Sequence, residues 1–142
     1  MSRRDIVEAR RIYLRHSQTG TKTRGVAILD TEKVLKKYVP MTETAFYILL
    51  SLVQPCHGYG IVKHVEEMTD MRIRLGSGTV YGTLTKMQKD GVITVFADEE
   101  RKTVYEVTEI GHKLITAEID RLKELYHNAL KYGEGFHDYK SI

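Results

Sequence analysis

The chain lacks several features that define whole classes of protein. It has one cysteine, Cys56, and no tryptophan among its 142 residues. No disulfide can therefore form within the chain, and no ligand can stack on an indole ring. No apolar run approaches the roughly 18–20 residues that a membrane span needs, and the charged N-terminus is not followed by the apolar stretch of a secretory signal. We therefore expect a protein that stays in the cytoplasm.

Recognisable groups for metal binding or catalysis are also missing. The six histidines are scattered, and none has an acidic or thiol partner at the spacing of metal ligands. The sequence shows neither a nucleophile with a paired base nor a phosphate-binding glycine loop. We expect Cys56 to be a small apolar filler, because no neighbouring residue type favours its thiolate over its thiol. These absences predict no cofactor, no metal and no enzymatic activity.

Charge is distributed unevenly along the chain. Residues 1–40 hold ten Lys/Arg and four Asp/Glu, a balance of +6, whereas residues 41–142 have a balance of −3. The overall charge of +3 by itself therefore does not predict nucleic-acid binding. If the main domain binds phosphate, its basic groups must be gathered locally.

Residues 1–40 form a basic N-terminal extension. Helical spacing of apolar side chains predicts a helix over residues 3–16, and β-branched composition suggests a short strand over 26–29. A short helix capped by Asp30 or Thr31 follows. The extension could be an arm that touches DNA, an additional dimerisation helix, or a segment that is disordered without a partner.

Two helices and a strand are expected over residues 41–75. Thr42 caps the first helix, which is apolar almost all round and ends before Pro55. A turn at residues 57–60 leads into the second helix, whose apolar spacing predicts a buried stripe of Ile61, Val65 and Met68. Residues 72–75 alternate in polarity, which predicts a half-buried strand with inward Ile73 and Leu75 and outward Arg72 and Arg74.

A third helix is predicted from a cap at Ser77 to about Asp90, and Gly91 suits its C-terminal end. Its buried stripe consists of Val80, Leu84 and Met87. The other side is small, hydroxylated and basic, with no acidic group before Asp90. Its residues are Ser77, Gly78, Thr79, Tyr81, Gly82, Thr85, Lys86 and Lys89.

Two β-branched runs, residues 92–96 and 103–107, predict a β-hairpin with a polar loop over 97–102. Thr108 caps a last helix over residues 109–133, and residues 134–142 form a tail. A helix of about 20 residues is about 30 Å long, so part of its apolar stripe needs a partner outside the domain. We expect dimerisation through Ile115, Ile119, Leu122, Leu125, Tyr126 and Ala129.

This order of elements predicts a mainly α fold with a small β-hairpin wing (α+β), a winged helix-turn-helix with a long C-terminal dimerisation helix. The winged-helix domain spans residues 41–108, and its third helix would enter the major groove. The expected DNA contacts are the face given above, Arg72 and Arg74, and Arg101 and Lys102 at the hairpin tip. Gly82 could allow close approach to DNA or to a neighbouring helix. Tyr81 could contact DNA or cover the edge of the core.

Five separate blocks of sequence resemble the PadR family of bacterial transcriptional regulators. They are residues 41–52 (MTETAFYILLSL), 57–61 (HGYGI), 72–84 (RIRLGSGTVYGTL), 90–93 (DGVI) and 105–111 (YEVTEIG). The single C-terminal helix is similar to the short-tailed branch of the family. Two departures are the 40-residue leader and a wing that has Lys102-Thr-Val-Tyr105 where the family often has an Arg-Lys-Tyr-Tyr-like run.

The resemblance implies a homodimeric repressor that binds double-stranded operator DNA of two-fold symmetry. It also implies release by a small-molecule inducer, and some members of this branch bind flat aromatic compounds between their subunits. The negative balance of residues 41–142 keeps a second hypothesis open, a winged-helix protein-interaction module that does not bind DNA.

Overall fold

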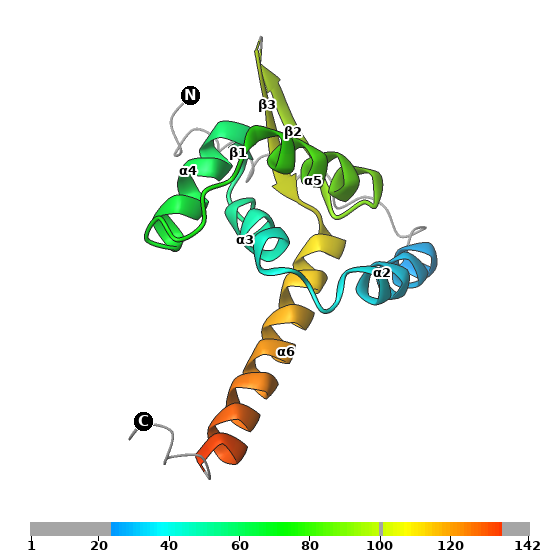
Figure 1. Cartoon of the computed structure of the whole chain (residues 1–142). Helices are drawn as coiled ribbons and strands as arrows, with labels where there is room; N and C mark the ends of the chain where they lie inside the picture. Colours follow the sequence, from blue (N-terminus) through cyan, green and yellow to red (C-terminus); the bar gives the residue numbers. More distant parts are fainter. Residues whose placement is uncertain (1–23, 100, 135–142) are drawn as a thin grey trace.

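The computed structural model describes residues 24–99 and 101–134. The helix predicted over residues 3–16 and almost all of the predicted tail lie outside these residues. In chain order the elements are α2 (Arg24–Tyr38), α3 (Glu43–Ser51), β1 (Cys56–His57), α4 (Gly58–Met68), α5 (Ser77–Lys89), β2 (Ile93–Glu99), β3 (Lys102–Val107) and α6 (Glu109–Gly133) (Figure 1). The fold is mostly helical with one small antiparallel sheet, which confirms the predicted fold class.

The sheet has the strand order β1-β3-β2. The hairpin pairs Ile93 with Val107 at its base and Glu99 with Lys102 at its tip, and its register shifts between Val95 and Ala97. Its strands are longer than predicted, because pairing continues through most of the polar segment expected to be loop. β1 adds two residues to the other edge of β3, with Cys56 opposite Tyr105.

Helix ends follow local chemistry at most of the predicted positions. The Thr42 hydroxyl oxygen accepts the Ala45 N–H at 3.2 Å, and that of Thr108 accepts the Gly111 N–H at 3.1 Å. Gly91 follows α5 with a φ of 75°, a left-handed conformation that glycine adopts without strain. These observations confirm the predicted caps of α3 and α6 and the glycine after α5.

A single core lies where α3, α4 and α5 meet the sheet and the first half of α6. Ile48 and Leu49 of α3 are fully buried, as are Ile61 of α4 and Leu114 of α6. Fully burying an aliphatic side chain of this size stabilises the fold by about 1.5–3 kcal/mol. Val80, Leu84 and Met87 of α5 belong to the same core, which therefore fixes α5 to α4 and to the sheet.

Several local predictions were wrong. Asp30 and Thr31 cap no helix, because both lie inside α2. Residues 26–29 are part of α2, which packs against α6, and not a strand. Residues 72–75 form no strand, because the edge of β3 is occupied by β1, although Ile73 and Leu75 do pack against the core and Arg72 and Arg74 are exposed. Met68, at the end of α4, is 37% exposed, and the N-cap of α5 is Gly76 rather than Ser77.

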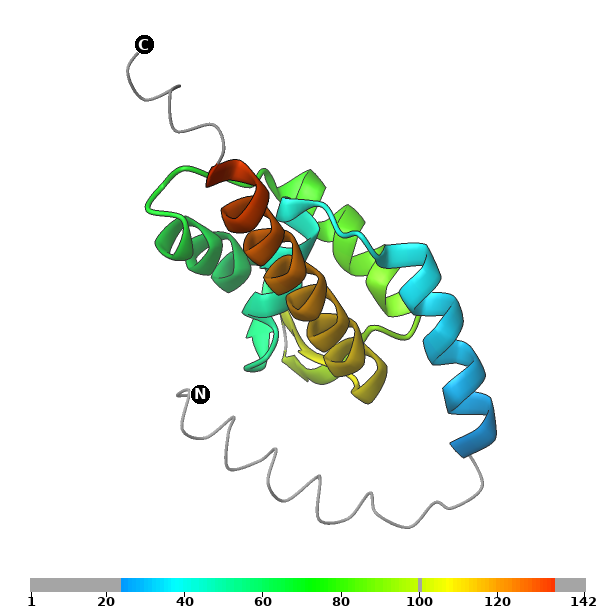
Figure 2. The same ribbon diagram turned by 90° about the horizontal axis from the view of Figure 1, so that it is seen from below.

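The hairpin and α5 lie at one end of the molecule, and the outer half of α6 extends from the other (Figure 1). Seen from below, α6 runs across the body while α2 lies to one side of it (Figure 2). No helix in the described part of the chain is long and apolar enough to cross a membrane.

Candidate nucleic-acid interface

The exposed face of α5 is set by the burial of its opposite side. Val80, Leu84 and Met87 are at most 1% exposed, which fixes the rotation of the helix about its axis. The other side is open along its whole length and carries no acidic side chain. All eight residues predicted for this face are exposed: Ser77, Gly78, Thr79, Tyr81, Gly82, Thr85, Lys86 and Lys89.

At Gly78 and Gly82 no side chain projects from this face of α5. A Cβ atom added at Gly78 or at Gly82 would meet no atom of the described chain within 4 Å. Packing against another helix within residues 24–99 or 101–134 therefore does not explain Gly82. A glycine inside a helix lowers the stability of the helix by about 1 kcal/mol relative to alanine. Here the missing side chain leaves a strip of helix backbone exposed.

Tyr81 covers part of the edge of the core and also remains exposed. Its side chain is 54% exposed, yet its ring packs over the first residue of α4, where a Cβ atom on Gly58 would lie 3.0 Å from Tyr81 Cζ. The contact holds the hydroxyl-bearing edge of Tyr81 beside the start of α4.

Two further residues near this contact were not predicted from the sequence. Tyr59 is 63% exposed, and Lys63 Nζ lies 4.9 Å from the centre of its ring. Residues 57–60 were interpreted only as a turn. The exposed aromatic residue with a lysine one helical turn later was the signal that could have revealed them.

The start of α5 offers free backbone donors. Gly76 is the N-cap, with extended backbone and no side-chain hydrogen bond to the first turn. The first N–H groups of a helix have no partner within the helix, and its N-terminus carries a partial positive charge. This end of α5 therefore suits a phosphate oxygen.

The basic residues outside α5 differ in availability. Arg72 is bound to Glu43, with Nη1 to Oε2 at 3.3 Å and a second bond to Oε1. This hydrogen bonding lowers the pKa of Glu43 and raises that of Arg72. Arg74 is exposed, and so are Arg101 and Lys102 at the hairpin tip.

Acidic side chains share the hairpin tip with these two cations. Asp98 and Glu99 are both exposed there, and Asp98 accepts a hydrogen bond from the Thr103 hydroxyl at 3.3 Å. The hairpin is therefore a weaker cationic surface than α5.

The C-terminal end of α5 is tied to α2. Asp90 accepts hydrogen bonds from Lys37 Nζ at 2.9 Å and from the Tyr38 hydroxyl at 2.7 Å. Burial acts to raise the pKa of Asp90, but the two hydrogen bonds outweigh it and the pKa lies below its usual value. Burial and the bond to Asp90 raise the pKa of Tyr38 well above its usual range. Lys86 Nζ lies 5.6 Å from the centre of the Tyr38 ring.

The predicted dimerisation stripe on α6 divides in two. Ile115 is 7% exposed and lies in the core of its own chain. Ile119 and Leu122 are 39% and 37% exposed, Leu125 and Tyr126 more so, and Ala129 is also exposed. The outer half of α6 therefore presents an apolar surface that the described part of its own chain leaves uncovered.

A groove of about 450 Å³ lies between this surface and α3. Phe46, Tyr47, Leu50 and Leu122 line its apolar part. Glu118, 1% exposed, lies in its floor and accepts hydrogen bonds from Arg121 at 2.5 and 3.0 Å. In the described ranges, no group of three His, Cys, Asp or Glu residues could hold a metal ion.

Helices α4 and α5 joined by a turn, with a hairpin behind them, define a winged helix-turn-helix protein. Residues 48–117 match the model of the transcriptional regulator PadR-like family, which confirms the resemblance predicted from the sequence. The expectation that the protein is not an enzyme agrees with this match, since the matched family and the similar structures are transcription regulators.

Solved structures share the fold. A transcriptional regulator from Clostridium thermocellum is 24% identical, with 70% of this chain and 94% of that chain covered and a TM-score of 0.57. A PadR family transcription regulator from Clostridium difficile is 18% identical, with 64% and 98% covered and a TM-score of 0.55.

A more distant similarity is to BpsR of Bordetella bronchiseptica, whose DNA binding is regulated by 6-hydroxynicotinic acid. It is 15% identical, with 76% of this chain and 79% of that chain covered and a TM-score of 0.51. Comparison of the sequence with curated proteins gave no match.

Proposed function

We propose that the protein is a homodimeric transcriptional repressor that binds operator DNA through α5 and acts in the cytoplasm. The observation that carries the proposal is the open face of α5, which is small, hydroxylated and basic and has no acidic side chain. A helix enters the major groove with its N-terminal half against base edges. Thr79 and Tyr81 occupy that half, and Lys86 and Lys89 follow where phosphates flank the groove.

Neighbouring elements complete the proposed interface. The uncapped start of α5 would bind one phosphate, and Tyr59 and Lys63 of α4 would contact the same strand, because Tyr81 packs against the start of α4. Arg74, Arg101 and Lys102 are exposed for backbone contacts. Arg72 would contribute less, since Glu43 already binds its guanidinium.

We assign residues 41–108 to DNA binding and residues 109–133 to dimerisation. Support for the dimer comes from the uncovered apolar surface of Ile119, Leu122, Leu125, Tyr126 and Ala129. Exposed apolar patches of this kind mark interfaces. Release by a small-molecule inducer would place this chain alongside BpsR, whose DNA binding is regulated by an organic acid.

The competing function is a protein-interaction module without DNA binding, which the balance of −3 over residues 41–142 favours. Fluorescence anisotropy with a duplex from the protein's own upstream promoter separates the two. For a DNA-binding protein, affinity should fall steeply between about 50 and 200 mM salt, because phosphate contacts release counterions. Absent or salt-insensitive binding would favour the interaction module.

Repression needs its own assay, because binding alone does not give the sign of regulation. A reporter fused to the same promoter should increase in output when the gene is deleted and return to the low level when the gene is supplied again. A fall on deletion would mean activation instead.

A further inference from the structure

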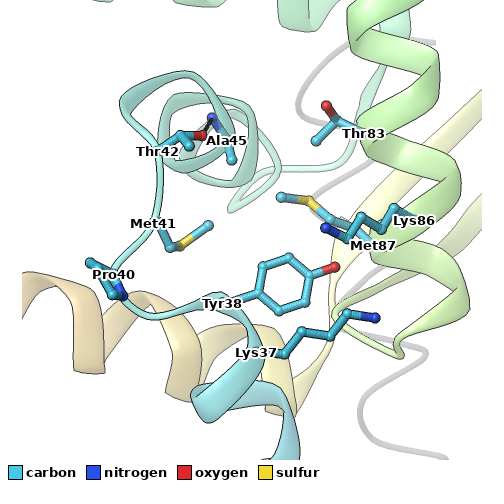
Figure 3. Close-up of a pocket in the computed structure, with 9 residues that line it drawn as sticks. All are labelled: Lys37, Tyr38, Pro40, Met41, Thr42, Ala45, Thr83, Lys86 and Met87. Carbon is cyan, nitrogen blue, oxygen red and sulfur yellow. Dashed lines mark hydrogen bonds between the residues drawn. The ribbon is translucent and has the colours of Figure 1, made fainter.

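A second pocket, of about 300 Å³, lies where α2 and the residues after it meet α5 (Figure 3). Its lining residues are Lys37, Tyr38, Pro40, Met41, Thr42, Ala45, Thr83, Lys86 and Met87. Most of them precede residue 48, where the match to the family model begins. Only Lys37, Tyr38 and Pro40 precede the block of residues 41–52 that resembles the family, so the N-terminal extension supplies one side of the pocket and the winged-helix domain supplies the rest.

The cations at the pocket differ in what they bind. Lys37 already forms an ion pair with Asp90 at 2.9 Å. Lys86, on α5, has no carboxylate within ion-pair distance among the described residues, and its ammonium group points into the space between Tyr38 and Met87 (Figure 3). The positive charge of Lys86 also acts on the Asp90 carboxylate, whose pKa it helps to lower, but of the two lysines that line the pocket it is the one that forms no ion pair with a described residue. A ligand with a single negative charge therefore suits the pocket better than a dianion such as a phosphate monoester.

Hydroxyl groups and apolar walls complete the site. Thr42, the N-cap of α3, and Thr83 of α5 also line the pocket. The Thr42 hydroxyl oxygen accepts the Ala45 N–H (Figure 3), which leaves its proton free to donate a hydrogen bond. Pro40, Met41, Ala45 and Met87 supply apolar walls, and methionine side chains adapt readily to the shape of a guest. A volume of about 300 Å³ is at the small end of the range for small-molecule sites.

We propose that this pocket binds a small organic carboxylate with a short apolar body, with Lys86 as its cationic contact. The consequence for regulation rests on the proposed function. Lys86 also belongs to the α5 face assigned to DNA, so a carboxylate that holds its ammonium group in the pocket withdraws it from phosphate. By linkage, carboxylate and DNA then weaken each other's binding by the same factor.

The probe for the site itself is sodium hexanoate, with hexan-1-ol as the neutral molecule of equal chain length. Titration of protein labelled with ¹³C at the methionine methyl groups reports binding at Met41 and Met87 without any DNA. We expect saturable shifts of both methyls with hexanoate, at an affinity on the order of millimolar for so small a ligand. Hexan-1-ol should bind at least about tenfold more weakly, because it lacks the charge-assisted hydrogen bond.

Lys86→Gln keeps the helix and most of the side-chain length while removing the charge, and should weaken hexanoate binding by about tenfold or more. Lys36→Gln is the matched control, since Lys36 is exposed on α2 but does not line the pocket, and should bind as the parent does. Absent shifts, equal binding of hexan-1-ol, or parental affinity in Lys86→Gln would overturn the site.

Promoter binding by the parent protein, measured in sodium hexanoate and in sodium chloride of equal concentration, tests the coupling. Weaker DNA binding in hexanoate, and no such difference in Lys86→Gln, would support it. Equal binding in the two salts would overturn the coupling while leaving the site in place. If the protein binds hexanoate but no DNA, the proposed function fails and the pocket stands.

Discussion

At the scale of single residues, Gly111 and Gly82 differ in what surrounds them, and the difference indicates why each position is a glycine. A Cβ atom on Gly111 would lie 2.2 Å from the Val92 carbonyl oxygen and 2.5 Å from Val107 Cγ1, whereas one on Gly82 would meet nothing within 4 Å. Gly111 is therefore required by the contact between α6 and the sheet. Gly82 has no such contact.

Gly111→Ala should lower the free energy of unfolding by about 1–3 kcal/mol through overpacking. Gly82→Ala should raise it by about 1 kcal/mol through helix propensity, yet weaken binding to promoter DNA, because the methyl group obstructs close approach. Urea denaturation and anisotropy measure the two effects. Unchanged DNA affinity in Gly82→Ala would remove this glycine from the interface.

The buried carboxylate of Glu118 makes stability depend on acid pH. The hydrogen bonds from Arg121 lower its pKa, burial opposes them, and the Met41 N–H adds to the lowering. A carboxylate with a lowered native pKa stabilises the fold above its unfolded pKa of about 4.3, and that contribution is lost as pH falls through the native value.

Glu118→Gln should reduce the free energy of unfolding near neutral pH by about 1–3 kcal/mol, since Arg121 loses a charged partner. The difference from the parent should shrink as the pH falls below about 4.3. Denaturation curves at several pH values measure this. A constant difference at every pH would contradict the assignment of the lowered pKa to this residue.

At the scale of elements, the DNA binding proposed for α5 depends on the side of the helix that the core leaves exposed. Its basic residues lie in its last turns, with Lys86 close to Tyr38 and Lys89 exposed. Lys89 is therefore the simpler test of a phosphate contact, because it does not line the pocket at α2.

Lys89→Ala should weaken binding to every DNA sequence similarly and reduce the slope of log K against log salt by about one. Lys123→Ala on α6, also an exposed lysine, should leave the slope unchanged. A parental slope in Lys89→Ala would mean that this end of α5 does not touch the DNA backbone.

Local chemistry made several elements predictable. The hydroxyls of Thr42 and Thr108 and the positive φ of Gly91 depend on residues within one helical turn. β1 was not predictable in the same way, since two residues become a strand only because Tyr105 and Val104 pair with them. The helical conformation of residues 26–29 likewise goes against the β-branched Val26 and Ile28, because these residues belong to a longer helix, α2, that runs on to Tyr38.

The same distinction applies to the candidate site. The open face of α5 follows from helical periodicity and the burial of Val80, Leu84 and Met87. The bond between Tyr38 and Asp90 joins residues 52 apart in the sequence, so no local pattern could reveal the pocket beside it. Nor could periodicity distinguish Ile115, which faces its own core, from Ile119, which does not.

At the scale of the whole molecule, the account requires a second copy to cover the outer half of α6. The double variant Ile119→Gln and Leu122→Gln should sediment as a monomer, because it places two amides in the apolar surface. Asp120→Ser with Glu124→Gln, on the opposite side of α6, should remain dimeric. A double variant that still forms dimers would place the interface elsewhere.

The proposed dimerisation also bears on affinity, since two α5 helices on one operator would contact two half-sites. The most direct test of the central claim is the ratio of affinities for the operator and for a scrambled duplex of equal length. Tyr81→Phe, which keeps the ring against Gly58, and Thr79→Ala are the informative variants. We predict that the parent prefers the operator and that at least one variant loses about tenfold or more of that preference, the effect of one good base contact. An unchanged ratio in both variants would contradict the assignment of α5 as the helix that contacts the bases.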